Sequence, residues 1–240
     1  MGIAIMRLFL LIVAAAALFA SSARAQTSKL TLDFGLVNAS GNSDFTSINL
    51  GDKATRGVGG FAFTQTAKVL YGETEGSRTT ESYDVSVRGD RALSRRIGLF
   101  LLGQYQRDPF AGLASRWSGG PGLAVSLLRS ARDTLGVEEA VTEQRERSIA
   151  GLAESFAATR TAALFKHTFA ATSSISEAVE WIANLKTSDD YRLNSETALT
   201  APVSRQIALR VSYLIRFDNQ PEPGFKKSDR ILTTGVQIAL

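Results

Sequence analysis

The feature that most constrains the fold is an apolar/polar alternation with a period of two near the C-terminus. In residues 207–217 every second side chain is apolar, and the intervening positions include Arg210 and Arg216. Residues 232–240 repeat this pattern. Successive side chains of a β-strand point to opposite faces, so each segment predicts a strand with one apolar and one polar face.

Similar alternation continues upstream. The clear segments are Leu30–Leu36, Tyr83–Arg88, Val179–Lys186 and Arg192–Leu199, and the weaker ones are Ser43–Asp52, Gly60–Tyr71, Arg96–Arg107, Ser115–Leu128, Arg132–Glu143 and Ala157–Ala170. With the two C-terminal segments this gives about 12 strands, an even number, as single-chain bacterial barrels require. The sequence therefore predicts an all-β fold, an antiparallel up-and-down transmembrane β-barrel formed by residues 26–240.

The N-terminus has the pattern of a secretory signal peptide over residues 1–25. Arg7 precedes an apolar run, and Ala23-Arg24-Ala25 is a small-x-small cleavage site, so cleavage after Ala25 is expected to leave Gln26 first. The alternative is an uncleaved anchor, but the apolar run is shorter than the ~20 residues of a spanning helix. The expected location is the outer membrane of a Gram-negative bacterium.

The predicted connections alternate between tight turns and longer polar loops, as in outer-membrane barrels. Residues 148–158 fit either a further strand or a loop, and an even strand count favours a loop. The tight turns are expected near Ala54–Gly57, Leu93–Arg95, Ser130–Ala131, Thr172–Ser174 and Pro202–Ser204, and the long loops at Gly72–Arg78, Asp108–Ala114, Gln144–Phe156 and Asp218–Ser228.

Alternation alone also fits a soluble β-sandwich with its apolar face inside. In a barrel, however, the polar faces of all strands converge on one lumen. The lumen-facing charges predicted in this way are Asp33, Asp84, Arg88, Glu180, Arg192, Glu196, Arg210 and Arg216, together with Lys68 and Lys166. Aromatic residues at the predicted strand ends, including Tyr105, Trp117 and Phe217, resemble the girdle of a membrane barrel and favour that interpretation.

Charge and cysteine content exclude several functional classes. Loss of Arg7 and Arg24 with the signal peptide leaves 25 Lys and Arg against 23 Asp and Glu, so a nucleic-acid partner is not expected. The chain has no cysteine, which excludes disulfides and thiolate metal sites. No cofactor is indicated.

Candidate chemical sites are few. His167, the one histidine, lies in a predicted strand and lacks partners for a metal site. Glu138, Glu139, Glu143 and Glu146 suit either a divalent cation or a solvated loop flank balanced by neighbouring arginines. Residues 226–227, both Lys, fit either lipopolysaccharide phosphates or a solvated loop. We expect no catalytic, cofactor-binding or metal-binding residue.

Several segments carry a family resemblance: Tyr105–Leu113, Gly120-Pro121-Gly122, Tyr191–Thr197, Tyr213–Pro221 and Lys226–Asp229. Over the whole mature chain the sequence resembles the YdiY-like family of salt-induced outer-membrane proteins, which is otherwise classed as a domain of unknown function. Ser228 stands where the family usually has Thr, and Leu135–Glu139 matches loosely. The resemblance implies an outer-membrane barrel without an assigned activity, and it supplies no catalytic residue.

These observations predict a non-enzymatic envelope protein, either structural or a narrow pore, with the link to salt stress implied only by the resemblance. The alternatives are a channel or transporter for a small solute and, third, an outer-membrane hydrolase. The expected partners are outer-membrane lipid, lipopolysaccharide and the barrel-assembly machinery. The machinery is expected to recognise the C-terminal strand, which resembles a barrel signature but ends in Leu240 where an aromatic residue is usual.

Overall fold

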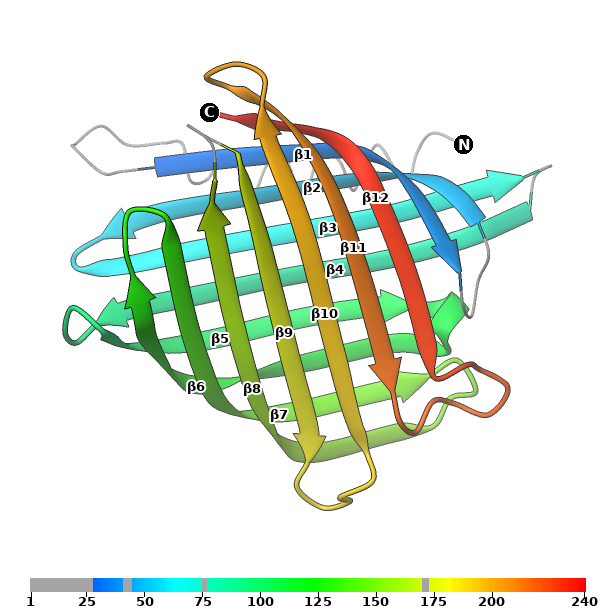
Figure 1. Cartoon of the computed structure of the whole chain (residues 1–240). Coiled ribbons are helices and arrows are strands. Elements are labelled where there is room, and N and C mark those ends of the chain that lie inside the picture. The colour runs from blue at the N-terminus through cyan, green and yellow to red at the C-terminus, as the bar shows by residue number, and fades with distance from the viewer. Residues whose placement is uncertain (1–27, 41–44, 75–76, 170–172) are drawn as a thin grey trace.

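The computed structural model describes residues 28–40, 45–74, 77–169 and 173–240 (Figure 1). The predicted signal peptide and Gln26 lie outside these residues. In the described part of the chain, twelve strands form one closed barrel in which each strand pairs with its neighbours in sequence and β12 pairs with β1. The strands are β1 Ser28–Ser40, β2 Phe45–Val58, β3 Phe61–Thr74, β4 Ser77–Ala92, β5 Ile97–Asp108, β6 Leu113–Arg129, β7 Asp133–Ser148, β8 Ala153–Thr168, β9 Ser174–Asn184, β10 Tyr191–Pro202, β11 Ile207–Asp218 and β12 Ser228–Ala239.

The first and last strands close the barrel as an antiparallel pair. Asp33 pairs with Gln237 and Gly35 with Gly235, and Gln237 donates a side-chain hydrogen bond to Asp33 at 3.0 Å. The closed antiparallel β-barrel that the alternation predicts is thus confirmed. We call the end with Ser28 and Leu240 the terminal end and the opposite end the loop end.

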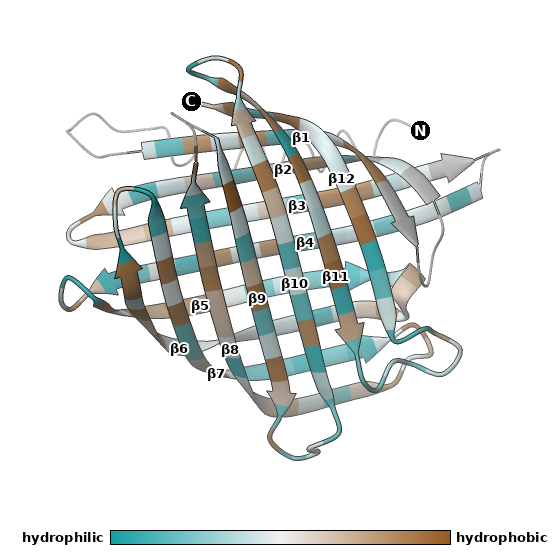
Figure 2. Ribbon diagram, in the orientation of Figure 1, coloured by the Kyte–Doolittle hydropathy of each residue, from teal (hydrophilic) through white to brown (hydrophobic). Residues whose placement is uncertain are grey.

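The two faces of the wall differ as predicted. Large apolar side chains stand exposed on the outside, such as Leu101 at 63% and Val211 at 42%. Figure 2 shows apolar and polar residues alternating along the strands. Near the loop end the rings of Tyr105 and Trp117 lie 4.7 Å apart, within an outer row of aromatic residues. No helix among the described residues is long and apolar enough to cross a membrane.

The tight turns lie at the terminal end and have local causes. Gly59 and Gly60, both with positive φ, connect β2 to β3 in a two-residue hairpin. In three other turns a serine hydroxyl accepts hydrogen bonds from backbone N–H groups two and three residues later. These are Ser94, Ser130 and Ser204.

Three predicted connections are wrong. In the predicted loop at 72–78, residues 72–74 belong to β3 and residues 77–78 to β4. Residues 54–57 belong to β2, because the hairpin glycines come two residues later. The predicted loop at 144–156 is mostly strand, since β7 continues to Ser148 and β8 begins at Ala153. The segment 148–158 therefore adds no extra strand, and the strands simply extend beyond the expected boundary.

A glycine-rich stretch shapes β6. A Cβ on Gly122 would lie 2.2 Å from the ring of Phe100 on β5, so a side chain at that position would have to displace the ring. The Phe100 ring is buried inside the wall, and the Arg88 guanidinium lies over it at 3.9 Å. Aromatic and cationic groups therefore fill the lumen beside β5 and β6.

Candidate functional site

An internal cavity of about 920 Å³ occupies the barrel. Its lining runs from Thr31 and Gln237, near the terminal end, to Leu152 and Lys226 in connections at the loop end. Charged side chains of both signs line it. Barrels of about 8 strands are filled by side chains and those of 16–18 leave an aqueous channel, so a narrow cavity agrees with twelve strands.

Most of the charges predicted to face the lumen line this cavity. Those that do are Asp33, Asp84, Glu180, Arg192, Glu196, Arg210 and Arg216. Lys68 also lines it, whereas Lys166 shares the inner face by register with Ser176 but lies outside the lining. Arg88 also faces inward, where its guanidinium group binds carboxylates.

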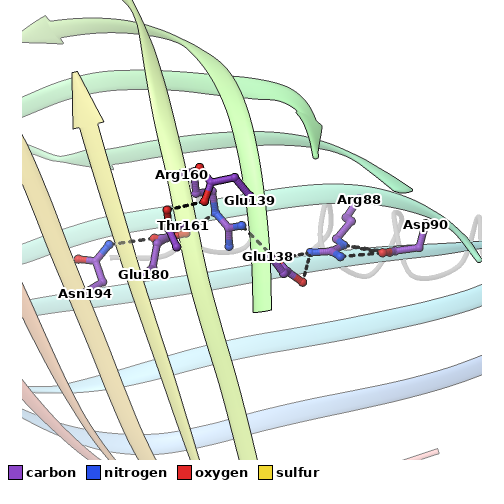
Figure 3. Close-up of polar contacts among 8 residues, drawn as sticks. All are labelled: Arg88, Asp90, Glu138, Glu139, Arg160, Thr161, Glu180 and Asn194. Carbon is purple, nitrogen blue, oxygen red and sulfur yellow. Dashed lines mark hydrogen bonds and ion pairs between the residues drawn. The ribbon is translucent and has the colours of Figure 1, made fainter. Parts of the chain in front are cut away.

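Arg88 begins a ladder of alternating charges across the barrel (Figure 3). It contacts Asp90 at 2.7 Å on its own strand and Glu138 on β7 at 2.8 Å. The contact between Arg88 and Glu138 passes over β5 and β6. It therefore separates the sector filled by Phe100 from the open cavity.

The ladder continues along the wall. Arg160 on β8 binds Glu138 at 3.0 Å and Glu180 on β9 at 2.6 Å, and Asn194 on β10 donates to Glu180 at 3.0 Å. Each carboxylate thus has two partners from different strands. This arrangement fixes the side chains along one side of the cavity.

A second contact crosses the open part of the cavity. Lys68 on β3 reaches Glu196 on β10, with Nζ 3.4 Å from Oε2. Arg210 on β11 binds the same carboxylate at 2.6 Å. Because β3 and β10 lie on opposite walls, the lysine side chain spans the passage.

Arginines gather at the loop end of the cavity. Glu146 on β7 forms ion pairs with Arg116 from β6 at 2.8 Å and with Arg192 from β10 at 2.6 Å. Arg216 on β11 pairs with Asp108 on β5 at 3.5 Å, which again joins opposite walls. Ion pairs between side chains of five strands thus narrow the cavity at the loop end.

The connection between β11 and β12 covers part of this end. A Cβ on Gly112, in the β5–β6 connection, would lie 3.0 Å from Cβ of Glu222 and 3.1 Å from the ring of Phe225. Ile149, in the β7–β8 connection, donates its backbone N–H to the Gly112 carbonyl at 2.9 Å. In Figure 1 these three connections come together beside the ends of β11 and β12. We call residues 219–227 the mouth loop.

Sequence reasoning missed several members of these networks, namely Arg116, Glu138, Glu146 and Arg160. Glu138 and Glu146 occupy even positions of β7, in the same alternation as Gln144. Extending the period-two alternation through residue 148 would have predicted that both face the lumen. The acidic run that suggested a cation site or a loop flank is instead divided by the strand, with Glu138 and Glu146 inside and Glu139 and Glu143 outside.

The other candidate residues lie in separate places on the barrel. His167 lies on the outer face and its Nδ1 contacts Oδ1 of Asp133 at 2.7 Å. Among the described residues, no three acidic or histidine side chains come close enough to hold a metal ion. Lys226 and Lys227 line the cavity, and Lys227 donates to Asn219 at 3.0 Å.

Some polar side chains lie on the outer face, and each has a polar partner there. Thr161 donates to Glu139 at 2.6 Å, and Ser195 donates to Glu177 at 2.6 Å. Cross-strand pairing of this kind lowers the cost of a polar group at a lipid-facing position.

The barrel is similar to solved structures of porins. The NanC porin gives a TM-score of 0.61 at 12% identity over 87% of this chain and 100% of that chain. The KdgM porin gives 0.52 at 10% identity over 87% and 98%. A bacterial polysaccharide outer membrane secretin gives 0.51 at 6% identity over 89% and 98%. At these identities the likeness shows the fold alone.

Comparison of the sequence with curated proteins finds no match. The sequence of residues 32–239 matches a family described as "Protein of unknown function, DUF481". This range spans nearly the whole barrel, and it confirms the resemblance to an uncharacterised family. The chain therefore belongs to the DUF481 family of proteins of unknown function.

Proposed function

We propose that this chain forms a narrow pore for small solutes in the outer membrane of a Gram-negative bacterium. The observation that carries the proposal is the charged cavity whose lining extends from Thr31 near the terminal end to Lys226 at the loop end. Charged side chains face this cavity and some, such as Lys68 at 63% exposure, remain open to it, so the lumen suits aqueous passage better than structural packing.

The outer surface supports a membrane location. Exposed apolar side chains such as Leu101 and Leu209 cover the wall, and a closed barrel leaves no strand edge unpaired in lipid. The tight turns at the terminal end would then face the periplasm and the mouth loop the exterior, the usual orientation of such barrels. Export through a signal peptide over residues 1–25, cleaved after Ala25, belongs to the same proposal.

The proposal includes the expected partners and condition of expression. Lipopolysaccharide would surround the outer face, and the assembly machinery would recognise β12. The link to salt stress rests on the family resemblance and concerns expression, not conductance. A hydrolase gains no support from His167, which lies on the outer face opposite Asp133 and does not line the cavity.

Current through planar lipid bilayers tests the pore. We expect purified, folded protein to produce discrete current steps smaller than those of 16-stranded porins, because the cavity is narrow and crossed by ion pairs. Boiled protein is the control. Insertion without current steps, verified by protease protection of the barrel, would overturn the pore and favour a structural role.

A further inference from the structure

We infer that Lys68 determines both the ion selectivity and the effective width of the passage, an inference that rests on the proposed pore. Lys68 lies on the inner face in register with Asp84 on β4 and Gly51 on β2, and Gly51 in turn pairs with Asp33 on β1. One row of the wall therefore carries carboxylate, glycine, lysine and carboxylate in order.

The two carboxylates of this row are held without a cation. Gln237 donates to Asp33 at 3.0 Å, and Gln104 and Gln106 donate to Asp84 at 3.2 and 2.8 Å. A carboxamide satisfies the oxygen atoms but leaves the negative charge uncompensated. Within the described residues neither carboxylate has a cation within ion-pair distance, so Lys68 supplies the positive charge of this row.

Lys68 does not bind its neighbours on the wall but extends across the passage. Its side chain is 63% exposed and makes one 3.4 Å contact with Glu196. Glu196 is 22% exposed and is bound more closely by Arg210 at 2.6 Å. Loss of Lys68 therefore leaves Glu196 paired, whereas the row of Asp33 and Asp84 becomes net negative.

These contacts assign two separable effects to one side chain. Its charge offsets two wall carboxylates, so removing the charge should favour cations. Its length crosses the passage, so removing its bulk should increase conductance. Gly51, the neighbour of Lys68 in this row, has no side chain, so nothing projects into the passage from that position beside the lysine.

Lys68→Met and Lys68→Ala separate charge from bulk. In a KCl gradient across a planar bilayer, we expect both variants to shift the reversal potential toward cation selectivity several-fold in permeability ratio. Only Lys68→Ala should also increase the conductance markedly. The shift should be larger at 0.1 M than at 1 M salt, because the Debye length falls from about 10 Å to about 3 Å.

Lys166→Met is the matched control, since Lys166 lies on the inner face but outside the cavity lining; it should keep the parental reversal potential. Glu196→Gln provides an independent variant and should shift selectivity toward anions, because it leaves Lys68 and Arg210 without their carboxylate. A parental reversal potential in Lys68→Met, or shifts of the same sign in Lys68→Met and Glu196→Gln, would overturn the inference. Absence of current in the parent protein would instead refute the pore itself.

Discussion

At the scale of single residues, shared ion pairs allow charges to be held inside this barrel. Glu138 lies between Arg88 and Arg160, and Glu146 lies between Arg116 and Arg192. Removing the sole partner of a buried charge costs on the order of 3–5 kcal/mol. A carboxylate with two arginines keeps one when the other is lost, so such pairs resist single substitutions better than isolated ones.

The outer face, in contrast, should exclude charged side chains, and a substitution at Val211 tests this requirement. Val211 faces outward beside Leu199 on β10 and Thr234 on β12. Val211→Arg should reduce the free energy of unfolding by about 2–4 kcal/mol, the cost of arginine near the bilayer midplane. Ile215 lies on the same face nearer the loop end, so Ile215→Arg should reduce the free energy of unfolding by only about 0–1 kcal/mol. Urea titration in lipid vesicles measures both, and equal stabilities would contradict the predicted depth of β11.

At the scale of elements, the alternation in the sequence was sufficient to predict strand number and facing. Each side chain of a strand such as β11 faces either the outside or the lumen, so the facing can be predicted from the local sequence alone. The adjoining ends of β7 and β8 could not be recognised from the sequence, because the exposed Arg145 and Arg147 at the end of β7 resemble a polar loop. Turn positions therefore depend on where the strands leave the membrane.

The mouth loop offers a test at this scale. Gly112→Val should displace the loop, because the new side chain would meet Glu222 and Phe225. Protease cleavage within residues 219–227 of protein in vesicles should then become faster. Gly151→Val is a matched control: its φ of 88° is close to the 84° of Gly112, so the backbone strain is similar, but nothing lies within 4 Å of its Cβ. Equal cleavage of both variants would show that strain, not contact, controls the loop.

At the scale of the whole molecule, closure creates the candidate site. Lys68 and Glu196 are 128 residues apart, and Arg216 and Asp108 are 108 apart. Period-two reasoning could place each of these side chains on the inner face, but it could not pair them. Partners across a lumen depend on how the strands are staggered around the barrel, and no local pattern encodes that stagger. The inner face was therefore predictable, whereas the two crossings of the passage were not.

The seam between β1 and β12 is the place where closure can be tested directly. A Cβ on Gly235 would lie 2.1 Å from the carbonyl oxygen of Phe34 and 2.7 Å from Cα of Gly35. These are backbone atoms of the partner strand, so Gly235→Val should separate the two strands and leave two unpaired edges, which lipid does not tolerate. Gly136→Val, on the inner face of β7, is the control, because its nearest neighbour is 3.8 Å away.

We expect the parent and Gly136→Val to migrate faster on a gel before boiling than after, as closed barrels resist detergent. Gly235→Val should show the slow form under both conditions and fail to protect its strands from protease. If Gly235→Val folded as completely as Gly136→Val, closure through the β1–β12 seam would not be what holds this barrel together.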